Sequence, residues 1–118
     1  MQKIKLENIP TLMENEVDCI RLLIEKLKGK VLVDKIVLFG SKARGDYTSE
    51  SDLDILLLVD DQDLVKSMDI VGDAQFESLL EIDSDLMTKV QLTKDWDSDH
   101  VWLPLKQNIL EEGIEIEL

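Results

Sequence analysis

The chain has 118 residues, 44% of them hydrophobic, which fits one domain with its own core, so we expect a single domain over residues 1–118. Its net charge of −13, from 26 acidic and 13 basic residues, argues against long nucleic acid as a partner, because binding a polyphosphate backbone needs a basic face. No apolar run approaches the ~18 residues of a membrane span and no secretory leader is visible, so we expect a cytoplasmic protein without a membrane partner.

The first part of the chain predicts a helix followed by a strand. Residues 11–14 match a helix-capping box after Pro10, apolar side chains recur at helical spacing from Met13 to Leu27, and Gly29 ends the pattern. Cys19 lies on the apolar side of this helix, which favours a packed thiol over a nucleophile or metal ligand. Residues 31–39 end in an apolar run and predict the first strand.

The remaining elements alternate between strands and helices. They are a short helical turn after Gly40, a strand at 53–59, a helix from 60–61 to about 80, a strand at 82–92, a polar connection at 93–99, a helix at 104–112 and an edge strand at 114–118. Together they predict an α/β protein with a small mixed β-sheet and helices mainly on one face.

Two aspartates at the start of the second strand form the first part of a candidate site. Side chains alternate along a strand at about 3.3 Å per residue, so Asp52 and Asp54 share one face roughly 6 to 7 Å apart. Two carboxylates at this distance repel, and a hard cation between them removes the repulsion. Mg²⁺ is typically bound by one or two carboxylates together with substrate phosphates, so the pair indicates a metal-nucleotide site.

The turn after the first strand supplies the second part. Gly40 allows the backbone to approach an anion closely, and Ser41 offers a hydroxyl and an N–H group. Lys42 and Arg44 add positive charge, and the guanidinium of Arg44 matches phosphate oxygens. We therefore expect these four residues to bind the phosphates of a nucleotide.

The two parts together resemble a known signature. Residues 39–45 (Phe-Gly-Ser-Lys-Ala-Arg-Gly), followed by Ser51-Asp52-Leu53-Asp54, are similar to the motif of the DNA polymerase β superfamily of nucleotidyltransferases, and at this length to its minimal nucleotidyltransferases. The resemblance implies the palm of the nucleotidyltransferase fold. It also implies that Gly40 and Ser41 contact a triphosphate and that Asp52 and Asp54 bind Mg²⁺. A third carboxylate on a neighbouring strand then completes the metal site and can act as base.

Two residues are candidates for the third carboxylate. Asp83 and Asp85 lie at strand spacing ahead of an apolar segment, and both would face the same side. Asp85 immediately precedes this segment, as the family's third acid does, and is our choice as catalytic residue and metal ligand. Asp83 remains the alternative.

The resemblance also implies a reaction and partners. The implied reaction is Mg²⁺-dependent transfer of a nucleoside monophosphate to a hydroxyl acceptor, and the expected case is transfer of AMP from ATP. Many minimal nucleotidyltransferases resemble antitoxins that modify a HEPN-type partner protein, and such a partner is the expected acceptor. A chain this short is expected to provide only part of a substrate cleft, which the partner protein would complete. A second copy of the chain, in a homodimer, is the other candidate for this role. The alternative function is a non-catalytic, antitoxin-like binding module that neutralises its partner by contact.

Overall fold

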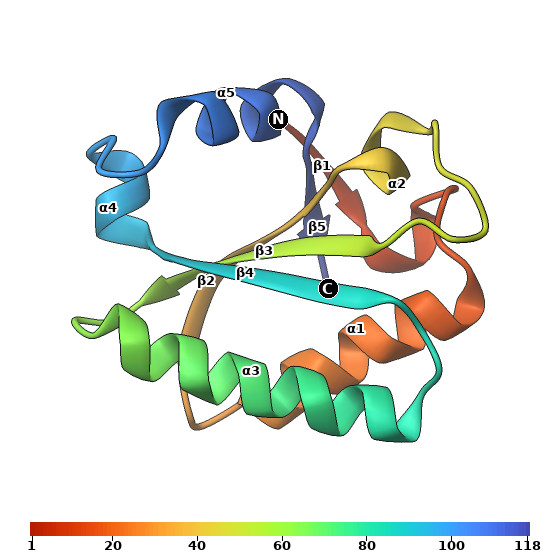
Figure 1. The fold of residues 1–118 in the computed structure, drawn as a ribbon, viewed down its shortest axis with the longest axis horizontal. Coiled ribbons are helices and arrows are strands. Elements are labelled where there is room, and N and C mark those ends of the chain that lie inside the picture. Colours follow the sequence, from red (N-terminus) through yellow and green to blue (C-terminus); the bar gives the residue numbers. More distant parts are fainter.

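A five-stranded mixed β-sheet forms the centre of the protein, here a computed structural model that describes residues 1–118 (Figure 1). Its strands are β1 (Gln2–Lys5), β2 (Leu32–Phe39), β3 (Leu53–Asp60), β4 (Leu86–Leu92) and β5 (Ile114–Glu117). They lie in the order β1-β5-β2-β3-β4. β3 runs parallel to β4 and β1 parallel to β5, whereas β2 is antiparallel to both of its neighbours. The predicted mixed sheet is confirmed.

Helices cover both faces of this sheet, with the two long ones on the same face (Figure 1). The helices are α1 (Glu14–Leu27), α2 (Ser41–Arg44), α3 (Leu64–Glu81), α4 (Thr93–Asp97) and α5 (Leu103–Glu112), with a short 3-10 helix at Leu6–Asn8. α1 and α3 pack under the sheet in the main core, which includes the buried Cys19, while α4 and α5 cover part of the opposite face. No helix combines the length and the apolar character that crossing a membrane requires.

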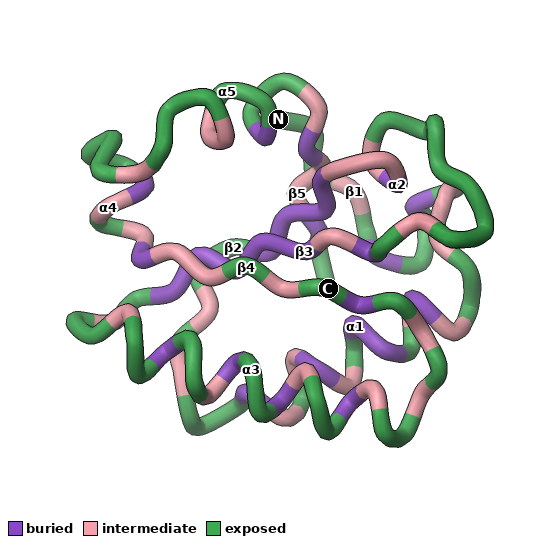
Figure 2. The backbone as a smooth tube through the Cα atoms, viewed as in Figure 1, coloured by how far each residue is buried: buried purple, intermediate pink, exposed green.

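Strand β3, which lies between β2 and β4, is buried without interruption from Ile55 to Val59, as Figure 2 shows. Its Ile55 and Leu57 belong to the core shared with α1 and α3. Leu56 and Leu58 pack with Trp96 of α4 and with α5 on the other face. Because side chains alternate, Asp54 shares the face of Leu56 and Leu58. The aspartate pair therefore opens toward the α4/α5 face, beyond the part that these helices cover.

Helix α1 begins later than the sequence predicted. Met13 is its N-cap residue, and the Glu16 carboxylate accepts the Met13 backbone N–H at 2.9 Å. The expected capping box at residues 11–14 is wrong, because the Thr11 hydroxyl instead donates to the Lys42 carbonyl oxygen at 2.6 Å. This bond attaches the segment before α1 to helix α2.

Other boundaries differ for similar local reasons. Strand β1 was not predicted, and the predicted edge strand at 114–118 is β5, an interior strand between β1 and β2. Helix α3 begins at Leu64 because Asp61 accepts the backbone N–H groups of Gln62 and Asp63, and Asp63 then caps the helix. The predicted connection at 93–99 contains the short helix α4.

Candidate active site

The Gly40 turn lies directly against Asp54. Gly40 follows β2, whose last residue Phe39 pairs with Asp54 of β3. Its φ of 75° and ψ of −156° fall in a region that essentially only glycine adopts. A Cβ added at this position would collide with an Asp54 carboxylate oxygen and would lie 3.3 Å from Asp54 Cγ. The two parts of the sequence motif therefore meet in space, and only glycine permits so close a contact.

Ser41 begins helix α2 beside this contact. The backbone N–H groups of Ala43 and Arg44 bond to the Gly40 carbonyl, which fixes the turn. The Ser41 hydroxyl has no hydrogen-bond partner within the protein and is half-buried. It is thus free to donate to a ligand placed over the turn.

The charge of the aspartate pair is only partly balanced by the protein. Burial raises the pKa of Asp54 above its ordinary value, and the neighbouring Asp52 carboxylate raises it further. The positive charges of Lys89 and Arg44 act in the opposite direction and only partly offset this rise in the pKa of Asp54. The ionised pair is therefore strained in the free protein, and a bound cation would relieve the strain.

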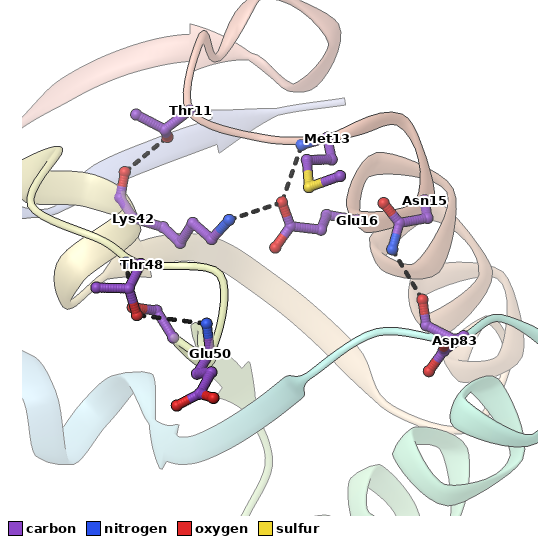
Figure 3. A network of polar contacts seen from close by, with 9 residues as sticks. Thr11, Met13, Asn15, Glu16, Lys42, Thr48, Glu50 and Asp83 are labelled. Carbon is purple, nitrogen blue, oxygen red and sulfur yellow. Dashed lines mark hydrogen bonds and ion pairs between the residues drawn. The ribbon is translucent and has the colours of Figure 1, made fainter.

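The two cations predicted to bind phosphate are both engaged with carboxylates of the protein. Lys42 is buried, and its ammonium bonds to Glu16 of α1 at 3.1 Å (Figure 3). The same ammonium lies 4.2 Å from the centre of the Tyr47 ring. Arg44 pairs with Asp46 at 3.1 Å and with Glu112 of α5 at 3.2 Å. Lys42 was expected to add positive charge for bound phosphates, whereas its ammonium here joins α2 to α1 through Glu16.

Asp83 and Asp85 lie at the same edge of the sheet but line a separate cavity. The Leu53 N–H bonds to the Asp85 carbonyl oxygen at 2.9 Å, which places Asp85 next to the start of β3. Asp83 accepts from Asn15 of α1 through its carbonyl oxygen (Figure 3). Both residues line a polar cavity of about 480 Å³, into which Lys42 and Glu16 also project. A buried Ser84 hydroxyl between the two aspartates has no hydrogen-bond partner.

The donor set fits a magnesium ion in part. Asp52 and Asp54 supply two carboxylates of the kind that Mg²⁺ prefers, and Asp54 carries the raised pKa expected of a pair that needs a cation. No group of three or more His, Cys, Asp or Glu side chains is close enough to hold a metal ion unaided. Mg²⁺ usually completes its shell with water and substrate phosphates, so two protein carboxylates suffice for an ion that arrives with a nucleotide.

Sequence reasoning missed two residues of this region. Glu16 was treated as part of an ordinary helix, although its carboxylate neutralises Lys42. Lys89 was treated as part of a strand, although it extends from β4 on the face of Asp54. Alternation along β4 could have indicated the face of Lys89, but only once β4 had been placed beside β3.

The sheet, the Gly-Ser turn against an aspartate and the paired carboxylates define a nucleotidyltransferase. Residues 20–116 match the family model described as a nucleotidyltransferase domain. The chain belongs to this family and is a nucleotidyltransferase enzyme.

Relatives and solved structures agree with this assignment. A protein of Methanocaldococcus jannaschii, named as a proposed protein adenylyltransferase, is 35% identical over 108 residues, covering 84% of this chain and 95% of the relative. A second protein from this organism with the same kind of name is 41% identical over 61 residues, covering 52% of this chain and 56% of the relative.

Two toxin–antitoxin crystal structures share the fold. One, determined with AMP-PNP, has a TM-score of 0.54 at 23% identity and covers 87% of this chain and 72% of that one. A mutant of the toxin–antitoxin MntA–HpeT has a TM-score of 0.55 at 25% identity, covering 90% and 72%.

Proposed function

We propose that the chain transfers AMP from ATP to a hydroxyl group of a partner protein, with release of pyrophosphate and in dependence on Mg²⁺. The observation that carries this proposal is the packing of Gly40 against the Asp54 carboxylate. This packing sets the turn that we expect to bind phosphates beside the aspartates that we expect to bind the metal, as transfer from a metal-bound nucleotide requires. The names of the Methanocaldococcus jannaschii relatives support adenylyl transfer to protein.

The chain's residues would divide the reaction as follows. The acceptor oxygen forms a bond to the α-phosphorus, the bond from this phosphorus to the bridging oxygen breaks, and pyrophosphate leaves. Asp52 and Asp54 would hold Mg²⁺, which when bound would supply positive charge to neutralise the phosphates. Ser41 and the Gly40 backbone bind the departing phosphates, with Arg44 at the side of the turn. Asp85, beside the start of β3, accepts the hydroxyl proton.

An exposed apolar stripe supports a protein as the acceptor. Val65, Met68, Phe76 and Leu80 are exposed on one side of α3. Met68 also lines a groove with the exposed Met87 of edge strand β4, and Met87 is the register partner of Asp54, so one end of this surface lies near the candidate active site. Apolar surface of this extent on a helix usually marks a binding interface.

Charge indicates which kind of partner fits. The exposed Asp69 and Asp73 lie beside the apolar stripe of α3 and have no ion-pair partner. A partner with apolar side chains bordered by lysine and arginine complements this surface. A second copy of the chain fits less well, because each copy carries a net charge of −13. We propose a HEPN-type protein with such a basic border as the acceptor.

Nucleotide binding provides the first test. Saturating Mg-ATP should raise the melting temperature of the wild-type protein, by about 10 °C at 100 times the dissociation constant. The double variant Asp52→Ala/Asp54→Ala should show no such shift. A wild-type protein whose melting temperature does not respond to Mg-ATP would refute the proposed function.

Group transfer provides the second test. The chain should be incubated with Mg²⁺, ATP labelled at the α-phosphate and a HEPN-type partner protein, and the partner should acquire covalent label. ATP labelled at the γ-phosphate should leave the partner unlabelled, because pyrophosphate departs. Transfer of γ-label would identify a kinase reaction and contradict the proposal.

The binding-module alternative is favoured by one observation. Asp85 lines the cavity with Asp83, and the three aspartates do not form a metal-binding cluster. If no base reaches the metal pair, the chain would bind nucleotide and partner without transfer. A tight complex that stays unlabelled under the conditions above would establish this alternative.

The docking surface has a matched test of its own. Phe76 on α3 and Leu32 at the start of β2 are similarly exposed, at 65% and 69%. Phe76→Glu should weaken binding of the partner at least tenfold, whereas Leu32→Glu should leave it within about twofold. Both variants should keep the Mg-ATP shift, which separates loss of docking from loss of folding. Equal effects of the two substitutions would rule out the α3 stripe as the docking surface.

A further inference from the structure

Neither of the two cationic side chains that the sequence predicted to bind phosphate is unpaired in the structure. A nucleotide triphosphate brings several negative charges to an edge that already carries Asp52 and Asp54. Lys42 is bonded to Glu16 and buried, and Arg44 is paired with two carboxylates. Positive charge for the phosphates must therefore come largely from another residue.

Lys89 on β4 is in a position to supply it. β4 is parallel to β3, with Met87 opposite Asp54 and Lys89 opposite Leu56. Residues 87 and 89 share one face of the sheet with residues 54 and 56. The spacing between and along strands puts the Cβ atoms of Lys89 and Asp54 about 8 Å apart, which a lysine side chain can span.

Nothing in the protein neutralises Lys89. Its ammonium takes part in no ion pair and no hydrogen bond within the chain, and the residue is exposed. Its positive charge nevertheless acts on the Asp54 carboxylate. Lys89 also lines a groove of about 420 Å³ that runs between α3 and β4, so its side chain has room to move.

We propose that Lys89 binds the α-phosphate of the nucleotide, the group that is transferred, and is thus a further catalytic residue. The strand order β2-β3-β4 places Asp54 between the Gly40 turn on one side and Lys89 on the other. If the turn holds the departing phosphates, as the proposed function states, the α-phosphate extends over Asp54 toward β4. A charge-assisted contact there would act where charge is redistributed during transfer.

Calorimetric binding of Mg²⁺ complexes of ATP, ADP and pyrophosphate tests this assignment without the acceptor. Lys89→Gln should weaken ATP and ADP binding by about 10-fold to 100-fold, the range of one charge-assisted hydrogen bond, and leave pyrophosphate within about threefold. Lys89→Arg should keep most of the affinity, because it retains the charge. Lys66→Gln, at an exposed and unpaired lysine of α3, makes the same charge change away from the site and should alter each affinity less than about twofold.

Three results would overturn the inference. Lys89→Gln could match Lys66→Gln for ATP, it could weaken pyrophosphate as much as ATP, or Lys89→Arg could bind as poorly as Lys89→Gln. Each result leaves the proposed function intact provided that the wild-type protein binds Mg-ATP. If the wild-type protein does not bind Mg-ATP, the inference about Lys89 and the proposed function are both refuted. The melting temperatures of all variants show whether a loss of affinity comes from unfolding.

Discussion

Lys42→Met should destabilise the protein strongly while leaving nucleotide binding intact. The side chains of Lys42 and Glu16 are only 5% and 8% exposed, so the pair is largely removed from solvent. Without the ammonium, the Glu16 carboxylate keeps a single donor, the Met13 backbone N–H. An uncompensated carboxylate in such a position is the costly product of breaking a buried ion pair.

The expected loss is about 3 kcal/mol. Removing one partner of a buried ion pair generally costs roughly 3 to 5 kcal/mol. The lower end applies because both side chains border the 480 Å³ cavity, from which water can reach Glu16 once Lys42 is shortened. For a chain of 118 residues each kcal/mol corresponds to about 4 °C, so the melting temperature should fall by about 12 °C.

Urea unfolding and thermal melting followed by circular dichroism measure this loss, with two comparison variants. Lys28→Met breaks an ion pair with Glu25 whose side chains are 70% and 68% exposed, and should cost less than about 0.5 kcal/mol. Adding Glu16→Gln to Lys42→Met removes the buried charge and should recover most of the stability. The reasoning fails if Lys42→Met costs no more than Lys28→Met. It fails equally if Mg-ATP affinity falls more than the stability loss explains, since Lys42 would then be a phosphate ligand.

Three further substitutions probe the site and its surroundings. Gly40→Ala should reduce Mg-ATP affinity at least tenfold because its methyl group collides with Asp54, whereas Gly29→Ala, at a similar φ of 77° with nothing within 4 Å, should leave affinity unchanged in the same titration. Asp54→Asn should raise the free energy of unfolding at pH 7 by up to about 1 kcal/mol, or about 4 °C in melting temperature, while abolishing the Mg-ATP shift. Burial raises the pKa of Asp54, so its ionisation costs stability as pH rises through and above the ordinary aspartate range, and melting curves of the variant should lose this dependence. The hydrogen bond from the Ser67 hydroxyl lowers the pKa of Asp61, so Asp61→Ala should lower the melting temperature at pH 7. The difference from the wild type should shrink as the pH falls below the ordinary pKa range of aspartate. A difference that persists in acid would show that the ionised carboxylate is not the source of the stability.

The part of the site that the sequence predicted is local in the chain. The Gly40 turn and Asp54 lie at the ends of two strands that are consecutive in the sheet and joined by the connection that contains α2, so pairing of these strands brings them together. The parts that it could not predict depend on distant segments. Glu16 of α1 forms an ion pair with Lys42 of α2. Strand β5, at the C-terminal end of the chain, pairs with β1, at the N-terminal end, and with β2. No periodicity within one segment encodes such a contact.

The arrangement of charges explains why the catalytic edge depends on its ligand. The protein neutralises Lys42 and Arg44 with its own carboxylates, and leaves Asp52 and Asp54 with only partial compensation from more distant charges. Local stability is therefore lower than it would be with one aspartate replaced by a neutral residue. In the complex that we propose, a metal-bound triphosphate would bring the missing cation to the aspartates and phosphate oxygens to Lys89. Binding energy and relief of electrostatic strain then act together, which is why we expect substitutions at Asp54 to change free-protein stability and nucleotide affinity in opposite directions.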